Sequence, residues 1–171
     1  MAKVFDASRP EEIRHWLEAG FEKAAERAVL ATAARLISHI QNDVIPKEDP
    51  KPVDRGLYRA GWRMKAIRKG AEVYNTVPHA PIIEYGARAQ NIKIGRVMID
   101  ALERWVIRKG IAGKADARGV AFAIANSLKK KGIFNRGGPG GLRILEKALV
   151  KLGDFLSREF PVEIRREFEK T

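Results

Sequence analysis

The chain has 171 residues, 45% hydrophobic and 32% charged, a balance that allows a buried core in a soluble protein. Its 33 Lys and Arg outnumber 21 Asp and Glu, and the net charge of +12 favours nucleic acid or an acidic protein surface as a partner. The absence of cysteine excludes disulfides, thiol catalysis and Cys-ligated zinc. No apolar run is long enough for a membrane span or a secretion signal, so we expect neither.

A long helix over residues 8–45 is the first predicted element. Ser8 and Glu11 have the spacing of a capping box, and Pro10 suits a first helical turn. Apolar or small residues then recur at helical spacing on one face: Ile13, Leu17, Phe21, Ala24, Ala28, Thr32, Leu36, Ile40 and Val44. Pro46 is expected to end this helix.

Residues 46–95 are predicted to form a loop, a β-hairpin and a second loop. Closely spaced prolines mark the first loop, and Asp54 is a candidate cap for a short helix through Arg59. A turn at Lys69-Gly70 would pair Ala66 with Val73, and in this register most apolar side chains share one face. Two strands alone are marginally stable, so we expect the hairpin to pack on the long helix or on a neighbouring subunit.

Residues 96–160 are predicted to be a helical region. A single helical turn is expected at residues 82–85, before Gly86, and longer helices over residues 97–109, 116–131 and 142–159. The last helix places leucines on one face, Pro161 is expected to break it, and a charged tail follows at residues 161–171. The predicted fold class is therefore α+β: a long N-terminal helix on a small antiparallel sheet, with a C-terminal helical region, in a single domain over residues 1–171.

The sequence shows no pattern that indicates catalysis, a cofactor or a metal. His15, His39 and His79 lack the i, i+4 spacing of a helical metal site. The glycine run at residues 137–141 lacks the Lys-Ser/Thr ending of a phosphate-binding loop, and no nucleophile motif is present. Glu84 lies between apolar neighbours and is better explained by a salt bridge than as a general acid. We therefore predict a protein that is not an enzyme.

Two groups of basic residues are candidates for contact with DNA or an acidic partner. Charge alone would let them bind phosphates without reading base sequence. They are Arg55, Lys65, Arg68 and Lys69 in the first group, and Lys129, Lys130, Lys131 and Arg136 in the second. Trp62 falls on the apolar face of the predicted hairpin, so core packing is favoured over base stacking for its ring.

The order of segments resembles the tail-completion, or neck, proteins of long-tailed bacteriophages, which are also called minor tail or head-tail joining proteins. Two motifs over roughly residues 50 to 110 carry the resemblance, and weaker likeness continues to about residue 145. The motif positions are Asp54, Gly56, Leu57, Arg59 and Gly61, then His79, Ala80, Glu84 and Gly86. The chain departs from the family pattern at two positions. Arg55 stands where Thr or Ser is common, and Ala87 stands where Thr is usual.

This resemblance implies a virion protein, assembled in the host cytoplasm, that completes the tail and joins it to the head connector. Such proteins form a ring, expected to be a hexamer, that contacts neighbouring neck, connector and tail-tube proteins. Genome DNA passes through the lumen of the ring without sequence-specific recognition. Candidate subunit-interface residues are Arg59, Trp62, Arg63, Tyr74, Glu84 and Tyr85. A tail terminator, or a basic module that binds DNA without sequence specificity, is the alternative function.

Overall fold

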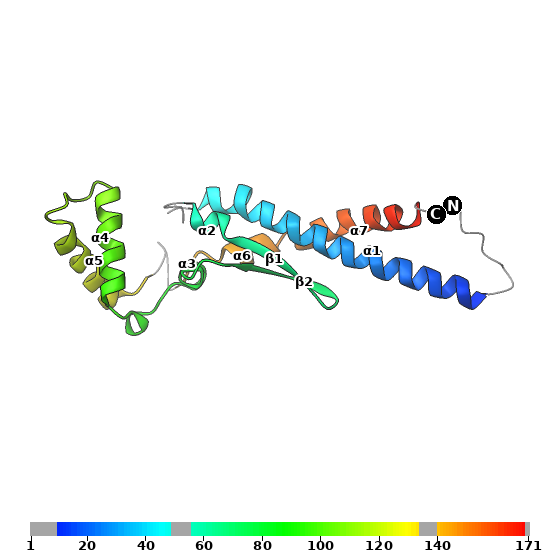
Figure 1. The fold of residues 1–171 in the computed structure, drawn as a ribbon, viewed down its shortest axis with the longest axis horizontal. Coiled ribbons are helices and arrows are strands. Elements are labelled where there is room, and N and C mark those ends of the chain that lie inside the picture. The colour runs from blue at the N-terminus through cyan, green and yellow to red at the C-terminus, as the bar shows by residue number, and fades with distance from the viewer. Residues whose placement is uncertain (1–9, 49–55, 134–139, 170–171) are drawn as a thin grey trace. The chain divides into compact units, whose positions relative to one another are not determined.

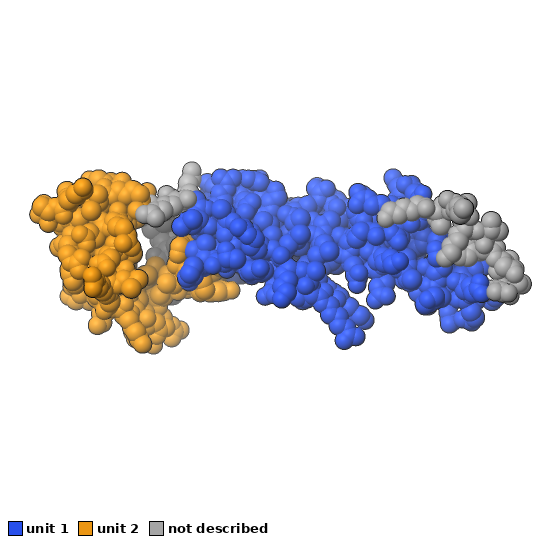
Figure 2. All heavy atoms as spheres, viewed as in Figure 1, with its two compact units in different colours: residues 1–78, 144–171 blue, residues 79–143 orange. Residues whose placement is uncertain are grey.

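The computed structural model describes residues 10–48, 56–133 and 140–169, and the fold is that of an α+β protein (Figure 1). It has a long N-terminal helix, a two-stranded antiparallel sheet and C-terminal helices, which confirms the predicted fold class. The chain divides into two compact units (Figure 2): unit 1 is residues 1–78 and 144–171, and unit 2 is residues 79–143. The predicted helix caps Ser8 and Asp54 lie outside the described residues.

The long helix of unit 1 buries the face that the sequence predicts. Helix α1 spans Pro10–His39, and the chain stays helical through a π-helical turn, Ile40–Val44, and a 3-10 turn, Ile45–Lys47, which contains Pro46. The buried positions follow the predicted stripe: Ala24, Ala28, Thr32, Leu36, Ile40 and Val44. Leu17 and Phe21, near the start of the same stripe, are exposed. The stripe is therefore a buried core face only from the middle of α1 onward.

Helix α7, Leu152–Phe168, packs along α1. The two helices approach closely at Gly20, where an added Cβ atom would lie 2.9 Å from the Phe168 ring. That ring packs against Trp16 and Phe21 of α1, with ring centroids 5.1 and 5.3 Å apart respectively. Small residues on α1 thus let a helix from the far end of the chain cover its core face.

The β-hairpin forms beside α1, but its predicted register is wrong by two residues. Strand β1, Trp62–Ile67, pairs with β2, Gly70–Asn75, so Ala66 lies opposite Ala71 rather than Val73. The turn is Arg68-Lys69, with Lys69 in the left-handed region at φ 59°. Because side chains alternate with period two, a shift of two residues leaves every side chain on its predicted face.

Contacts at the base of the hairpin account for the observed register. Short helix α2, Leu57–Ala60, precedes β1. Asn75, the last residue of β2, connects β2 to α2. The Asn75 side chain donates to the Tyr58 carbonyl at 2.8 Å and accepts from the Val77 amide at 2.9 Å. The Thr76 amide donates to the Gly61 carbonyl at 3.0 Å. These side-chain contacts align the strands, and a prediction based on turn residues alone misses them.

The prediction of one helix over residues 142–159 that breaks at Pro161 is also wrong. The structure has α6, Ile144–Leu149, then a turn at residues 150–151, then α7, which continues through Pro161. A proline inside a helix costs about 3 kcal/mol because one hydrogen bond is lost and the ring clashes with the preceding turn. The contacts that α7 makes with α1 on the C-terminal side of Pro161 offset this cost.

Unit 2 consists of short elements around a helix pair. Helix α3, Ala80–Tyr85, ends at Gly86 as predicted and is followed by a 3-10 turn, Ala89–Asn91. Helices α4, Arg96–Arg108, and α5, Ala117–Lys131, pack together around Ile99, Ala121 and Ala125. Both lie within a residue or two of their predicted bounds, since each carries a clear helical pattern between glycines.

Candidate functional site

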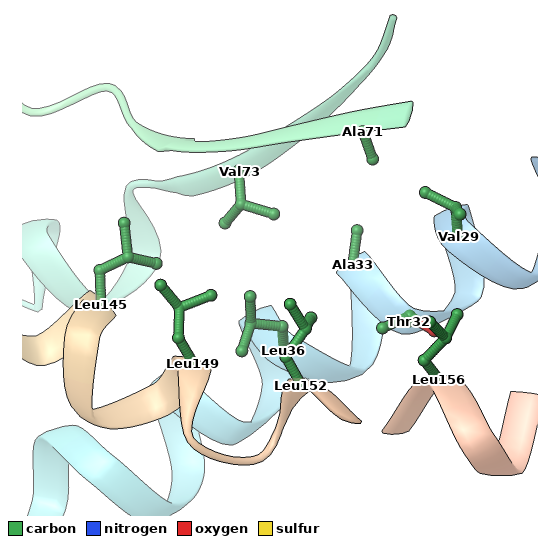
Figure 3. Close-up of a pocket in the computed structure, with 10 residues that line it drawn as sticks. All are labelled: Val29, Thr32, Ala33, Leu36, Ala71, Val73, Leu145, Leu149, Leu152 and Leu156. Atoms are coloured by element: carbon green, nitrogen blue, oxygen red, sulfur yellow. The ribbon is translucent and has the colours of Figure 1, made fainter. Parts of the chain in front are cut away.

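Unit 1 contains an open apolar groove. It lies between α1, β2, α6 and α7 and has a volume of about 300 Å³. Its lining is apolar apart from one hydroxyl: Val29, Thr32, Ala33, Leu36, Ala71, Val73, Leu145, Leu149, Leu152 and Leu156. Figure 3 shows Val73 of β2 facing the leucines of α6 and α7 across the groove. Three of these leucines, Leu149, Leu152 and Leu156, are 38% to 44% exposed, so the groove is incompletely covered.

The groove contains a buried polar atom that lacks a partner. Thr32 is 4% exposed, and its hydroxyl has no hydrogen-bond partner among the described residues. A buried hydroxyl without a partner costs about 1 to 3 kcal/mol. The subunit itself encloses this hydroxyl, so the missing hydrogen bond is a cost to the stability of unit 1.

The hairpin leaves strand edges free next to this groove. In the described parts of the chain, the sheet consists of β1 and β2 alone, so the outer edge of each strand has no strand partner. Free edges of this kind are sites where another chain can add a strand. Strand β2 therefore lines the groove with its side chains and also has a free edge, and both features suit protein assembly.

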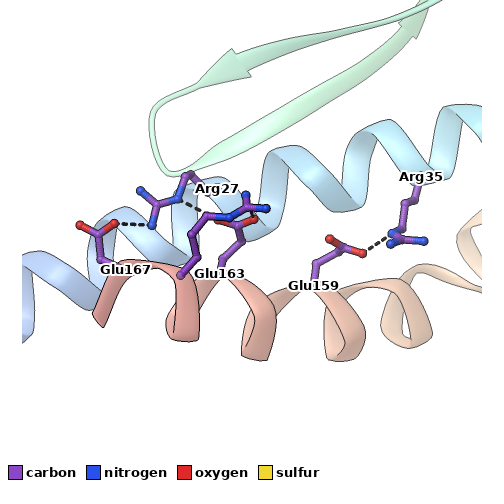
Figure 4. A network of polar contacts seen from close by, with 6 residues as sticks. Arg27, Arg35, Glu159, Glu163 and Glu167 are labelled. Atoms are coloured by element: carbon purple, nitrogen blue, oxygen red, sulfur yellow. Dashed lines mark hydrogen bonds and ion pairs between the residues drawn. The ribbon is translucent and has the colours of Figure 1, made fainter. Parts of the chain in front are cut away.

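A network of ion pairs fixes α7 on α1 (Figure 4). Arg27 donates to Glu163 at 2.9 Å and to Glu167 at 2.5 Å. Both hydrogen bonds raise the pKa of Arg27, and the one to Glu167 contributes most. Arg35 of α1 forms an ion pair with Glu159 of α7. Arg166, also in α7, forms an ion pair with Glu163. Glu159 and Glu163 are buried. The network has a structural role, because each buried carboxylate is paired with an arginine.

The predicted interface residues of unit 1 separate into exposed and buried positions. Trp62 is 3% exposed and packs edge-on against Tyr58, so it belongs to the subunit core, as its place on the apolar face suggested. Arg59, Arg63 and Tyr74 are exposed. Arg59 also donates to Asn42 at 2.9 Å. Arg63 donates to the Ala60 and Trp62 carbonyls at 2.5 and 2.7 Å. These two arginines therefore also brace the hairpin within the subunit.

In unit 2, Glu84 is buried and Tyr85 is 70% exposed. Residues 142–143 form backbone hydrogen bonds with the segment around Glu84. The Leu142 amide donates to the Ile83 carbonyl at 2.7 Å, and the Arg143 amide donates to the Glu84 carbonyl at 3.1 Å. Gly86 has φ 72°, and an added Cβ would lie 2.5 Å from the Ile133 carbonyl oxygen. The second motif of the sequence thus marks a tightly packed backbone crossing.

The predicted basic residues lie on the surface wherever the structure describes them. Lys65, Arg68 and Lys69 are exposed on the hairpin, and Lys129, Lys130 and Lys131 are exposed in the last turn of α5. Arg55 and Arg136 lie outside the described residues. The first group belongs to unit 1 and the second to unit 2.

The described residues offer no group of three or more acidic or histidine side chains that could hold a metal ion. The His39 Nδ1–H instead donates a 2.8 Å hydrogen bond to the Asp43 carboxylate, one helical turn away, and the His39 ring packs against Phe155. Within the same described ranges, no helix has both the length and the apolar character of a membrane span.

Comparisons with protein-family models, with curated proteins and with solved structures found no match to this chain.

The open groove is the feature that sequence reasoning missed. The sequence predicts that the leucines of residues 145–156 share one apolar helix face, a pattern typical of a core helix. The break at residues 150–151 divides that face between α6 and α7 and leaves the leucines partly exposed. A signal was present in Leu152-Gly153-Asp154, where a glycine and a first-turn acid suit the start of a new helix.

Proposed function

We propose that this protein is a structural component of the neck of a long-tailed bacteriophage. In this role it completes the tail and joins it to the head connector, as a ring around the DNA channel. The observation that carries the proposal is strand β2, which lines the apolar groove and also has a free edge. Monomeric proteins seldom leave such a combination uncovered, because it invites pairing with other chains.

The residues of the resembling motifs support an architectural role. An added Cβ at Gly61 would lie 2.5 Å from Asn75 Oδ1, and one at Gly86 would lie 2.5 Å from the Ile133 carbonyl oxygen. Side chains restrict the space at Gly61 and backbone restricts it at Gly86, and Glu84 is buried near the backbone crossing at Gly86. Motifs of this kind specify a fold, which suits a part whose function is to fit against copies of itself.

A second copy of the chain is the occupant that we assign to the groove. If the groove of one copy receives a different surface of the next, the contact is heterologous, and repeating it around an axis closes a ring. An extended segment from the neighbour would pair with β2 and place apolar side chains among the leucines of the groove. The exposed Arg59, Arg63, Tyr74 and Tyr85 would then lie on the remaining surface available to neighbouring proteins.

The primary experiment is electron microscopy of particles produced with and without the gene. Separate filled heads and tails of normal length, joined when the purified protein is added, are the expected result. Tails of abnormal length would instead indicate the alternative role of a tail terminator. Normally joined particles in the absence of the gene would refute the proposal.

A pair of matched variants tests the groove itself. The double variant Leu149→Glu/Leu152→Glu places two charges in the groove, whereas Val150→Glu/Val162→Glu places two charges at exposed apolar positions that do not line it. We expect both proteins to fold, with equal circular dichroism spectra, and only the groove variant to fail in joining. Equal joining by both variants would show that the groove is not an assembly surface.

A further inference from the structure

The positive charge of the chain is concentrated in unit 2. Residues 79–143 contain 13 Lys and Arg against 4 Asp and Glu, a net charge of +9. The remaining 106 residues contain 20 Lys and Arg against 17 Asp and Glu, a net charge of +3. An electrostatic attraction of the protein for polyanions would therefore come mainly from unit 2.

Two stretches of unit 2 lack acidic residues, and the fold brings them together. One is residues 85–99 and the other is residues 117–143. Ala87 and Ile133 exchange two backbone hydrogen bonds, of 2.9 and 2.7 Å, in an isolated antiparallel bridge. Helix α5 also packs on the 3-10 turn Ala89–Asn91. The C-terminal end of α5 and the segment before α4 thus lie side by side.

Five of the cations in these two stretches form what we call the basic cluster. Its members are Arg88, Lys93, Lys129, Lys130 and Lys131, and all five are exposed. None of them appears in the ion pairs found among the described residues. Like charges at such close sequence and spatial spacing repel each other, a cost that a bound polyanion would remove.

The acids of unit 2 are engaged elsewhere. Arg118 donates to Asp100 at 3.2 Å and to Glu103 at 2.8 Å. Both hydrogen bonds raise the pKa of Arg118, and the one to Asp100 contributes most. Glu84 is buried, and Asp116 lies at the start of α5, at the opposite end from the three lysines. The acids of unit 2 therefore do not form ion pairs with the basic cluster in the described parts of the chain.

We infer that the basic cluster binds the phosphate backbone of double-stranded DNA without reading its sequence. An acidic protein partner is less well matched, because protein interfaces need apolar or aromatic anchors. The exposed large apolar residues of the two stretches, Tyr85, Val97 and Phe122, lie outside residues 86–96 and 123–133, which carry the basic cluster. Single-stranded nucleic acid would need exposed aromatic rings among the cations for stacking, and residues 86–96 and 123–133 contain no aromatic residue.

Lysines and arginines spread over adjoining segments suit a duplex instead. Duplex DNA presents about one negative charge per 1.7 Å of helix axis, so a broad field of cations can contact several phosphates at once. This inference goes beyond the proposed assembly role. It rests on the placement of charge in unit 2, and it holds for this chain whether or not the protein forms a phage neck.

The test is fluorescence anisotropy of the full-length protein with DNA duplexes of unrelated sequence, over a range of salt concentrations. The logarithm of the binding constant falls with the logarithm of salt concentration by about 0.9 per phosphate contacted. The variant Lys129→Gln/Lys130→Gln/Lys131→Gln should reduce that slope by about 2.7. The variant Lys65→Gln/Arg68→Gln/Lys69→Gln removes three cations from the hairpin of unit 1, which is the competing candidate surface, and should reduce the slope by less than the α5 variant does.

A second variant guards against loss of structure at the end of α5, where lysines also favour the helix dipole. Arg88→Gln/Lys93→Gln changes only the partner segment and should reduce the slope by about 1.8. Tighter binding of polyglutamate of equal charge, through the same residues, would overturn the inference in favour of an acidic protein. So would a hairpin variant that loses more slope than the α5 variant.

The head-tail joining assay, run on the same variants, separates the two proposals. A chain that joins particles but shows no salt-dependent DNA binding overturns this inference alone. A chain that binds DNA through the basic cluster but has no effect on joining overturns the proposed function alone.

Discussion

Two adjacent glycines give a sharp test of how unit 2 closes. An added Cβ at Gly141 would lie 2.0 Å from the carbonyl carbon and oxygen of Glu84 and 2.2 Å from the Tyr85 nitrogen. An added Cβ at Gly140 would meet nothing within 4 Å. Neither residue has a positive φ angle. Gly141→Ala should therefore destabilise unit 2 strongly, and Gly140→Ala serves as its matched control.

The magnitude follows from the contacts at that point. The atoms that the new methyl group meets belong to the backbone, so the segment of residues 141–143 must move away from α3. That movement breaks the hydrogen bonds from Leu142 to Ile83 and from Arg143 to Glu84. Two hydrogen bonds at about 1 kcal/mol each, with overpacking of about 1 to 3 kcal/mol, give a loss of about 3 to 5 kcal/mol.

Native-state hydrogen exchange is the direct assay, because it reports the Leu142 and Arg143 amides individually. A loss of about 3 kcal/mol corresponds to exchange that is roughly 100-fold faster, since about 1.4 kcal/mol is a factor of ten. The unfolding temperature of unit 2 should also fall by more than about 10 °C. Gly140→Ala should leave both values close to those of the parent protein.

The reasoning would be refuted if the two alanine variants showed the same exchange rates. That result would mean that residues 141–143 do not pack against α3 in solution. The proposal that the second motif marks a tight backbone crossing would then lose its support.

Three further changes test unit 1, each by chemical denaturation. Gly61→Ala should cost about 2 to 4 kcal/mol, because the new methyl group displaces the Asn75 side chain, whereas Gly153→Ala, with open space around it, should stabilise by up to about 1 kcal/mol. Thr32→Val should stabilise the isolated chain by about 1 kcal/mol by removing an unpartnered hydroxyl, and Thr32→Ser, which keeps it, should not. Pro161→Ala should stabilise by about 2 kcal/mol, since the proline lies inside α7. A destabilised Thr32→Val or Pro161→Ala protein, or equal effects at the two glycines, would contradict these assignments.

The sequence by itself determined the elements whose pattern is local. The buried face of α1 and the bounds of α4 and α5 follow from apolar residues at helical spacing between glycines and prolines. The two faces of the hairpin were also predicted correctly, although the register was not. Helix and strand periods depend on residues within one or two turns of each other, so they can be read without knowing the rest of the fold.

The tertiary structure decided the features that join distant parts of the chain. Asn75 sets the hairpin register through Tyr58, and Arg27 with Glu163 holds α7 in place beyond Pro161. The bridge between Ala87 and Ile133 unites two basic stretches that are far apart in sequence. The groove likewise exists only where α1, β2, α6 and α7 meet. Each depends on which residues become neighbours on folding, and that is set by the packing of the whole unit, because local propensities of this size are easily outweighed by buried contacts.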